Sequence, residues 1–583
     1  MLKKLARCIR EYKRPTILTL ILMIGEAVVE TLIPFVTATF LINRIQEDGK
    51  DLEIGHILLW GGVLILMALV SLGCGGLAGF TSARASAGFA KNLRHDIFGK
   101  IQTFGFENID RFSTSSLVTR LTTDVFHVQM AFMMIIRTAV RSPLMLTFSV
   151  IMSAMMGGWL AATFAVVIPI LVIGLLIISK RAMPAFRRVF KKYDRLNESI
   201  EENVRAMRVV KGFSREEYEK EKFAVASDSI ADDFTRAERI VALNTPLMNF
   251  CMYFNMTVVL LLGSFMAISG IGGVQIGQIS ALLTYGMQIL MSLMMLSMIY
   301  VMLTMSAESA KRICEVLDEE PAMKLAENPI VAVKDGSIDF EGVSFKYSQK
   351  AERFALADID LHITSGMTVG IIGGTGSSKS SLVQLIPRLY DATTGCVKVG
   401  GVDVREYDLK ALRDSVAMVL QKNLLFAGTV KENLRWGNED ATDEELIEAC
   451  KLAQAHEFLT SFPDGYDTMI EQGGTNVSGG QKQRLCIARA LLKKPKILIL
   501  DDSTSAVDTK TDALIRAGFA SYIPNTTKII IAQRISSVQS ADLILVMDSG
   551  KIVSAGKHEE LLAGSEIYRE VYEQQTNGGD ENE

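Results

Sequence analysis

The 583-residue sequence is poor in cysteine and proline and has little net charge. Its seven cysteines form no CxxC pair, so neither a zinc site nor a disulfide framework is supported, and we expect reduced, packed thiols. Its 12 prolines and 45 glycines follow no repeat, which excludes a collagen-like or low-complexity chain. The net charge of −4 gives no support to nucleic-acid binding, so no nucleic-acid partner is expected.

Charged residues make up only 22% of the sequence and hydrophobic residues 49%, which argues against a wholly soluble protein. A helix needs about 20 apolar residues to cross a bilayer. The first half contains such stretches, and we predict an all-α membrane domain over residues 1–320 with six spans. These spans are residues 15–43, 57–83, 135–156, 159–180, 243–268 and 278–306.

The basic residues of this half predict its orientation. Residues 1–14 carry six Lys or Arg against one acid, and residues 180–211 carry ten against four, whereas residues 44–55 carry two against four. By the positive-inside rule, both termini are expected to be cytoplasmic and the protein to lie in the cell membrane. The first apolar stretch is of spanning length and lacks a small-residue cleavage site, so we do not interpret it as a cleaved signal peptide.

After residue 320 the pattern changes to apolar strands alternating with helices and glycine turns, which predicts an α/β domain. We expect a linker at 321–336, the α/β domain at 337–573 and a disordered, polar and acidic tail at 574–583.

The first clear motif of the α/β domain is a phosphate-binding P-loop. The apolar strand 367–372 runs into GGTGSSKSS and then into a helical segment, which is the context that a P-loop needs. Lys379 is expected to reach the phosphates and Ser380 to bind Mg²⁺, whereas Ser378 replaces the last glycine of the motif. The predicted phosphate-binding residues are Gly373, Gly374, Thr375, Gly376, Ser377, Ser378, Lys379, Ser380 and Ser381.

Two further motifs narrow the family. The strand KILILDD ends in Asp501 and Asp502, and NVSGGQKQR (476–484) precedes it, while VLQKNLLF contributes Gln421. In this order the C-terminal domain resembles the ATPase domain of ABC transporters. Six spans followed by this ATPase resemble a half-transporter of the exporter type, which implies the type I exporter (type IV ABC) fold and a second half-transporter as partner.

The resemblance implies ATP and Mg²⁺ as ligands and gives roles to individual residues. The aromatic ring of Tyr347 in FKY would stack on adenine. Gln421 would contact Mg²⁺ and the attacking water, and Asp501 would hold Mg²⁺ through a water. Asp508 would bridge the two sites of a dimer. The signature residues, which would close over the γ-phosphate of ATP held by the other subunit, are Ser478, Gly479, Gly480 and Gln481.

Two positions depart from the family pattern. Asp502 stands where the family usually has the catalytic Glu, and Gln533 stands where it has the switch His. A carboxylate that is one methylene shorter is misplaced by about 1 Å, which can cost about 10²-fold in rate, and Gln cannot become cationic. With Ser378, these changes predict a Walker site that binds ATP but hydrolyses it slowly. The chain thus resembles the degenerate-site subunit of bacterial heterodimeric multidrug exporters; a homodimer with two weak sites is the alternative.

Two turns in the membrane half, at 106–120 and 212–223, are similar to the intracellular coupling helices of the family. The resemblance implies that they pass movement of the ATPase to the spans. Their composition alone also fits solvated loops.

The sequence leaves the cargo open. Glu26 and Glu30 lie four apart inside the first span, where they either attract cationic drugs or bond to neighbouring helices. A methionine stripe in the last span fits a polyspecific cavity or ordinary packing; its members are Met287, Met291, Met294, Met298, Met302 and Met305. The leading function is ATP-driven export of amphipathic drugs or lipids from the membrane. Alternatives are a dedicated peptide, bacteriocin or lipid exporter and a regulatory membrane ATPase without cargo.

Overall fold

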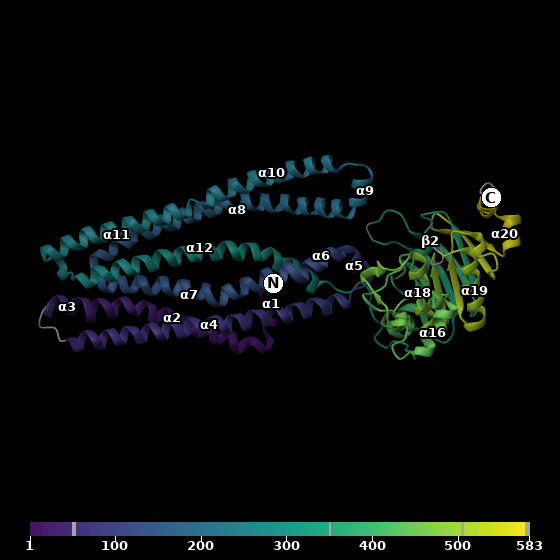
Figure 1. The fold of residues 1–583 in the computed structure, drawn as a ribbon, viewed down its shortest axis with the longest axis horizontal. Helices are drawn as coiled ribbons and strands as arrows, with labels where there is room; N and C mark the ends of the chain where they lie inside the picture. Colours follow the sequence, from purple (N-terminus) through teal and green to yellow (C-terminus); the bar gives the residue numbers. More distant parts are fainter. Residues whose placement is uncertain (49–53, 349–350, 503–506, 578–583) are drawn as a thin grey trace. The chain divides into compact units, whose positions relative to one another are not determined.

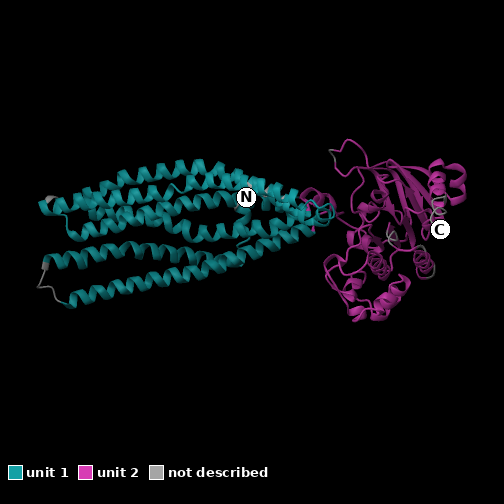
Figure 2. Cartoon of the chain, turned by 45° about the horizontal axis from the view of Figure 1, so that its top comes forward, with its two compact units in different colours: residues 1–102, 114–319 teal, residues 103–113, 320–583 magenta. Residues whose placement is uncertain are grey.

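The computed structural model describes residues 1–48, 54–348, 351–502 and 507–577. The chain forms two compact units, one of residues 1–102 and 114–319 and the other of residues 103–113 and 320–583 (Figure 2). The first unit is helical throughout its described residues, and the second combines helices with β-sheets. The predicted fold class, a helical transmembrane domain followed by an α/β ATPase domain, is therefore confirmed.

The first unit is built of long helices that run alongside one another (Figure 1). A π-helical turn, Thr37–Ile42, connects the second helix to the third. The helices are α1 (Leu2–Arg7), α2 (Lys13–Val36), α3 (Asn43–Asp48), α4 (Ile54–Gln102), α6 (Thr114–Thr119), α7 (Val125–Gly157), α8 (Ala162–Arg205), α9 (Met207–Gly212), α10 (Glu216–Val241), α11 (Asn244–Ser269) and α12 (Ile276–Asp318).

The apolar stretches predicted as spans lie in α2, α4, α7, α8, α11 and α12. Five continuous helical segments among the described residues are long and apolar enough to cross a bilayer. One of them, Thr114–Arg205, holds both α7 and α8, and the chain turns back between them at Gly158 (Figure 1). Gly158 has a φ of 46°, a conformation that glycine adopts at little cost, so it ends α7 and allows the hairpin.

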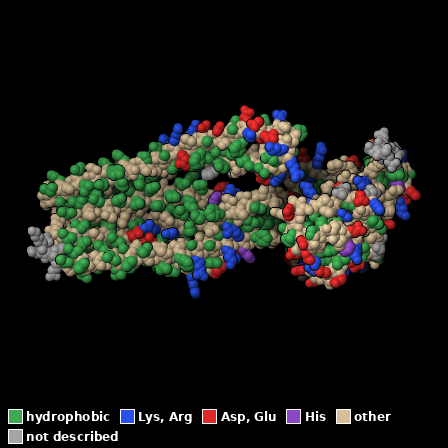
Figure 3. All heavy atoms as spheres, viewed as in Figure 1, with side chains coloured by type: hydrophobic (Ala, Val, Ile, Leu, Met, Phe, Trp, Pro, Cys, Tyr) green, Lys and Arg blue, Asp and Glu red, His purple; other side chains and the backbone are tan. Residues whose placement is uncertain are grey.

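Several of these helices are longer than a bilayer requires. Helix α4 has 49 residues, which at about 1.5 Å per residue is roughly twice the length needed to cross the hydrocarbon core. On the face drawn in Figure 3, hydrophobic side chains cover most of the helical unit, and charged side chains gather around α9 and α10. The helices therefore combine an apolar part with a polar extension.

The two predicted coupling turns contain different helices. The first comprises α5 (Phe106–Phe112) and α6. In the second, the short helix is α9, which lies earlier than predicted, and residues 216–223 form the first turns of α10. Glu216, Glu217 and Glu219 occupy that first turn, where negative charge stabilises the positive end of a helix.

The second unit contains a six-stranded sheet in the order β12-β11-β3-β10-β9-β6, a four-stranded antiparallel sheet in the order β2-β1-β4-β5, and a short β7–β8 pair. In the six-stranded sheet only β12 is antiparallel to its neighbour. The strands are β1 (Ile338–Phe345), β2 (Leu356–Ile363), β3 (Thr368–Gly373), β4 (Thr394–Val399), β5 (Val402–Asp403), β6 (Val416–Val419), β7 (Gly428–Thr429), β8 (Met469–Ile470), β9 (Ile497–Asp501), β10 (Thr527–Ile531), β11 (Leu543–Asp548) and β12 (Lys551–Gly556).

Helices of the second unit pack against these sheets (Figure 1). They are α13 (Lys379–Gln384), α14 (Leu409–Ser415), α15 (Val430–Arg435), α16 (Asp443–Leu452), α17 (His456–Thr460), α18 (Gly479–Leu492), α19 (Thr509–Tyr522), α20 (His558–Gly564) and α21 (Glu566–Asn577).

Both ends of the predicted α/β domain extend further than the sequence indicated. Val333, in the predicted linker, is 4% exposed and belongs to the core of the α/β domain. Part of the predicted linker therefore packs onto that domain. At the other end, α21 continues to Asn577, so the prediction of disorder was wrong for residues 574–577. Residues 578–583, the rest of the predicted tail, lie outside the described residues.

Candidate functional site

Four parallel strands bring the predicted nucleotide-binding segments to one edge of the six-stranded sheet. Strands β3, β10, β9 and β6 are neighbours in that order and run in the same direction. Their carboxyl ends are followed by the P-loop, Gln533, Asp502 and Gln421 respectively. The carboxyl edge of a parallel sheet is where α/β proteins bind ligands, so segments far apart in sequence meet in one candidate site.

The P-loop leaves β3 at Gly373, and a Cβ added there would lie 2.2 Å from the Met547 carbonyl oxygen, so only glycine fits. Gly376 and Ser378 both have positive φ, of 85° and 69°. Glycine adopts this left-handed conformation freely, but it costs an L-residue such as serine about 1–2 kcal/mol. The departure from the motif at Ser378 therefore places backbone strain directly before α13.

Lys379, the first residue of α13, folds back over the P-loop. Its Nζ donates to the carbonyl oxygens of Gly373 at 2.8 Å and Gly374 at 2.9 Å, and to Ser377 Oγ at 3.3 Å. Burial lowers the pKa of this ammonium, and the nearby carboxylates of Asp501 and Asp502 oppose that shift. A cation that is held among carbonyl oxygens in this way can exchange them for phosphate oxygens.

Ser380 and Asp501 form the part of the site that fits a magnesium ion. Ser380 Oγ donates to Asp501 Oδ1 at 3.0 Å, and Asp501 is only 4% exposed. Burial raises the pKa of Asp501, because a buried carboxylate lacks solvation for its charge. Carboxylate and hydroxyl oxygens are ligands that Mg²⁺ prefers, usually together with substrate phosphates. No cluster of three or more His, Cys, Asp or Glu that could hold a metal occurs among the described residues.

The two residues that depart from the family pattern contact each other. Gln533 Nε2 donates to Asp502 Oδ2 at 2.7 Å, and Gln421 Nε2 lies 3.4 Å from the same oxygen. Asp502 is 9% exposed and has a φ of 49°. One buried carboxylate oxygen thus accepts from two exposed carboxamides.

Tyr347 follows β1 and contacts the helix of the P-loop. Its hydroxyl lies 2.7 Å from Ser381 Oγ, and its ring makes an edge-to-face contact with that of Tyr390, with centroids 5.2 Å apart. The side chain is 43% exposed. An aromatic surface beside the P-loop helix is therefore open to a planar ligand.

The signature segment begins α18, and its polar side chains cap that helix. Ser478 N donates to Gln481 Oε1 at 2.9 Å, and Gln481 N donates to Ser478 Oγ at 3.3 Å. Among the described residues, no hydrogen bond joins this segment to the P-loop. Ser478 and Gly479 are exposed, so the segment is accessible to another molecule. Asp508 similarly caps α19 by accepting from Thr511 N at 2.9 Å.

Helix α5 belongs to the same compact unit as the site. Tyr390 donates from its hydroxyl to Asp110 Oδ2 at 2.8 Å, and its ring centroid lies 5.8 Å from that of Phe106. Since Tyr390 also contacts Tyr347, one aromatic side chain joins α5 to the residue predicted to bind adenine. Burial and the hydrogen bond to Asp110 raise the pKa of Tyr390, so its phenol remains a donor at neutral pH.

In the helical unit, the two acids of the first span are paired with a base. Arg141 on α7 donates to Glu30 Oε2 at 2.5 Å, and its Nε lies 3.5 Å from Glu26 Oε1. The second of the two interpretations, bonding to a neighbouring helix, therefore describes both acids. Neighbouring polar side chains extend this contact, since Gln288 on α12 binds Ser149 at 2.9 Å and lies 3.4 Å from the Glu30 carbonyl oxygen.

Part of the methionine stripe lines a cavity. A cavity of about 410 Å³, almost entirely apolar, lies between α8 and α12. Four of the six methionines of the stripe line it: Met294, Met298, Met302 and Met305. Met287 and Met291 are not among its lining residues.

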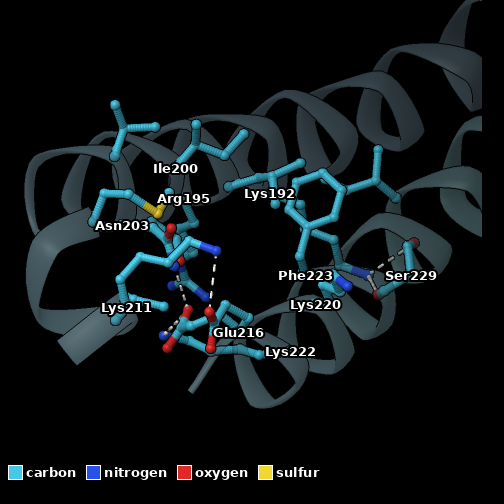
Figure 4. Close-up of a pocket in the computed structure, with 18 residues that line it drawn as sticks. Lys192, Arg195, Ile200, Asn203, Lys211, Glu216, Lys220, Lys222, Phe223 and Ser229 are labelled. Atoms are coloured by element: carbon cyan, nitrogen blue, oxygen red, sulfur yellow. Dashed lines mark hydrogen bonds and ion pairs between the residues drawn. The ribbon is translucent and has the colours of Figure 1, made fainter. Parts of the chain in front are cut away.

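A larger cavity, of about 830 Å³, lies between α8, α9 and α10 (Figure 4). Apolar side chains such as Ile200 and Phe223 face it together with several lysines. All four lysines that line it pair with acids: Lys192 with Asp233, Lys211 with Glu216, Lys220 with Glu217 and Lys222 with Glu219.

Sequence reasoning missed Arg141, Tyr390 and the end of α21. An arginine inside a predicted span that must neutralise two intramembrane acids is a signal that was available for Arg141. Tyr390 lies directly after the P-loop helix region, and its partners are almost 300 residues earlier in sequence, so no local pattern indicates its contact with α5.

Comparisons with known proteins agree with this geometry. Residues 16–293 match the family model of the ABC transporter transmembrane region, and residues 356–505 match a second family model, described as ABC transporter. A solved structure of a bacterial Atm1-family ABC exporter with ATP bound aligns with a TM-score of 0.83 at 24% identity, covering 96% of this chain and 98% of that one. This similarity supports the fold.

Curated relatives match over nearly the whole length. The chain is 37% identical to the uncharacterized ABC transporter ATP-binding protein YfiB of Bacillus subtilis, with 96% of each chain covered. It is 32% identical to an ATP-dependent lipid A-core flippase of Albidiferax ferrireducens, with 97% of this chain and 96% of the relative covered. With both family regions in one polypeptide, this multi-pass membrane protein belongs to the ABC transporter family and is an exporter-type half-transporter.

Proposed function

We propose that the chain is one half of an ATP-driven exporter of amphipathic drugs or lipids, with a second half-transporter as its partner and both termini in the cytoplasm. The observation that carries the proposal is the cluster at the sheet edge, where Lys379, Ser380 and Asp501 can bind ATP with its magnesium and Asp502 replaces the catalytic acid. The names of the relatives favour transport, and one of them is a lipid flippase.

In this proposal Lys379 binds the β- and γ-phosphates, while Tyr347 stacks on adenine. Ser380, Gln421 and Asp501 hold Mg²⁺, which neutralises phosphate charge. Asp502 and Gln533 orient the attacking water only weakly, because the carboxylate is short and the carboxamide cannot carry a proton's charge. This chain's own site therefore retains ATP and hydrolyses it slowly.

The signature segment has a different role, because it completes the competent site on the partner. The exposed N-terminus of α18, with Ser478 and Gly479 in its first turn, would direct its N–H groups to the partner's ATP. The exposed apolar side chains at α9 give further support to a partner, since Val209 is 57% and Phe213 76% exposed. A heterodimer is favoured over a homodimer because only a different partner supplies Glu and His.

Co-expression with the candidate partner half-transporter tests this assignment. In the assembled pair, Ser478→Ala should lower ATP turnover about tenfold or more, as loss of a transition-state contact does, whereas Asp502→Ala should change it less than about twofold. Thr442→Ala removes a comparable helix cap far from both sites and controls for lost stability. Fast ATPase of this chain alone that survives Asp502→Ala would contradict the degenerate site.

A second candidate, a dedicated lipid exporter, is favoured by the flippase relative and by the apolar cavity beside α12. Transport of fluorescent phospholipid and of a cationic dye into vesicles distinguishes the two cargo classes. ATPase activity without transport of either cargo, or of a peptide, would favour a regulatory membrane ATPase instead.

A further inference from the structure

The C-terminal helix α21 ends against the segment that carries the switch residue. Gln575 Nε2 donates to the carbonyl oxygen of Gln533 at 2.8 Å, and Gln575 Oε1 accepts from the backbone N–H of Ile535 at 2.9 Å. A single carboxamide thus binds the backbone on both sides of Arg534, as a neighbouring peptide group would. The segment 533–535 follows β10, and residue 533 is the one whose side chain contacts Asp502.

Helix α21 is itself held firmly enough to act as a support. Tyr568 is completely buried, and its hydroxyl lies 2.8 Å from His558 Nδ1. Val571 and Tyr572 pack against the core of the ATPase unit. Because residues three, four and seven apart share one helical face, Gln575 lies on the same face as Tyr568, Val571 and Tyr572. The packed face of the helix therefore directs this carboxamide to the switch segment.

The other end of the segment is fixed by packing. Ile535 is 1% exposed and belongs to the same core, whereas the Gln533 side chain is exposed above Asp502. The position of the Gln533 carboxamide thus depends on the orientation of its backbone, which the hydrogen bond from Gln575 constrains at the Gln533 carbonyl oxygen.

We propose that Gln575 is a positioning residue of the ATP site: its carboxamide holds the backbone of residues 533–535 so that the Gln533 side chain lies on Asp502. The role in ATP turnover rests on the proposed function, but the structural role does not. Gln575 lies in the polar tail, for which the composition predicted disorder. The proposed role needs no contact between Gln575 and the nucleotide.

Hydrogen exchange of the full-length protein in lipid tests the structural part. Gln575→Ala removes both hydrogen bonds and should speed exchange in the peptide covering 532–537 by about fivefold or more, since loss of a single one causes about a fivefold change in an opening equilibrium. Exchange in β9 and β10 should not change. Gln574→Ala is the matched control, because the neighbouring Gln574 side chain donates, among the described residues, only to Glu570 of its own helix, at 3.4 Å.

Steady-state kinetics of the full-length chain without the partner half-transporter, where turnover comes from the chain's own site, test the effect on that site. We expect Gln575→Ala to lower kcat about threefold with KM for ATP unchanged, because the residue orients a group that acts after binding. In a Gln533→Ala background, Gln575→Ala should lower kcat no further, since it acts through the residue already removed.

Unchanged exchange in 532–537, faster exchange across the whole ATPase unit, or additive effects in the double variant would each overturn the proposal. Local exchange and kinetics that behave as expected, in a protein that transports no cargo, would support the positioning role and contradict the exporter assignment. The two proposals can thus fail separately.

Discussion

The Nε2 atom of Gln533 lies 2.7 Å from the Oδ2 atom of Asp502 and donates a hydrogen bond to it. By resemblance, these are the two positions at which the chain is expected to depart from the catalytic pattern of the family. The Gln533 carboxamide carries no charge but can still donate a hydrogen bond to the shorter carboxylate of Asp502, so the two side chains are compatible with each other. The two departures are thus one structural unit, and variants at the two positions should be interpreted together.

Lengthening the Asp502 side chain should raise the rate of ATP hydrolysis at this chain's own site, which we propose to be slow. Asp502→Glu extends the carboxylate by one methylene, and we expect it to raise hydrolysis at this chain's own site about tenfold or more, because errors of about 1 Å cost about 10²-fold. The measurement is ATP turnover of the full-length chain in lipid without the partner half-transporter, so that only this chain's own site contributes. Asp502→Asn keeps the length of the native residue and serves as control; an equal rise in that variant would contradict the explanation.

Replacing the strained serine of the P-loop should stabilise the ATPase unit. Ser378 has a φ of 69°, so Ser378→Gly should raise the free energy of unfolding by about 1 kcal/mol, offset in part by glycine's greater freedom in the unfolded chain. Thermal unfolding of the full-length protein without nucleotide measures this gain. Ser378→Ala retains the strain and removes only the hydroxyl. A gain of the same size in that variant would assign the effect to the side chain instead.

Replacing Arg141 alone should lower the stability of the protein more than replacing Arg141 and Glu30 together. Arg141→Gln leaves the partly buried Glu26 and Glu30 without this cation; breaking a fully buried pair costs about 3–5 kcal/mol, and we expect a smaller loss for these partly exposed side chains. The double variant Glu30→Gln/Arg141→Gln leaves one acid fewer and should recover part of the lost thermal stability in lipid. Equal stability of the single and double variants would show that the pairing contributes nothing.

The contact between Tyr390 and α5 should matter for coupling more than for ATP binding. Tyr390→Phe keeps the ring contacts and removes the hydrogen bond to Asp110, so we expect cargo-stimulated ATPase to fall severalfold while basal turnover persists. Asp110→Asn retains an acceptor oxygen and should have a smaller effect. Because the pKa of Tyr390 is raised, the phenol stays protonated, and stimulation should not change between neutral pH and the ordinary pKa of tyrosine. A loss of basal activity equal to the loss of stimulation would argue against a role in coupling.

The parts of the site that depend on local spacing could be predicted from sequence. Lys379 and Ser380 follow a glycine-rich turn between a strand and a helix, and Asp501 ends an apolar strand, so their chemistry is visible in short segments. The membrane domain was also predictable from local sequence, because a long apolar run that crosses a bilayer must satisfy its backbone hydrogen bonds internally, as a helix does.

The remaining parts depend on contacts between distant segments. The pairing of Arg141 with Glu30 joins α7 to α2, and that of Gln575 with Gln533 joins the last helix to a loop after β10. The polar composition at Gln575 predicts disorder, and packing of Tyr568 and Val571 overrides it. For the second predicted turn, composition left a loop and a short helix open, and its acids lie in the first turn of α10, where they stabilise the start of that helix.

The inclusion of residues 103–113 in the ATPase unit has a practical consequence for cutting the protein into pieces. A fragment that begins at residue 320 would lack α5 and would expose to water the half of Tyr390 that now faces Phe106, beside the rings of Phe345 and Tyr347. Uncovered aromatic patches promote self-association. The soluble piece most faithful to the intact protein is therefore discontinuous, with an 11-residue peptide from the membrane half added back in trans or joined through a short linker.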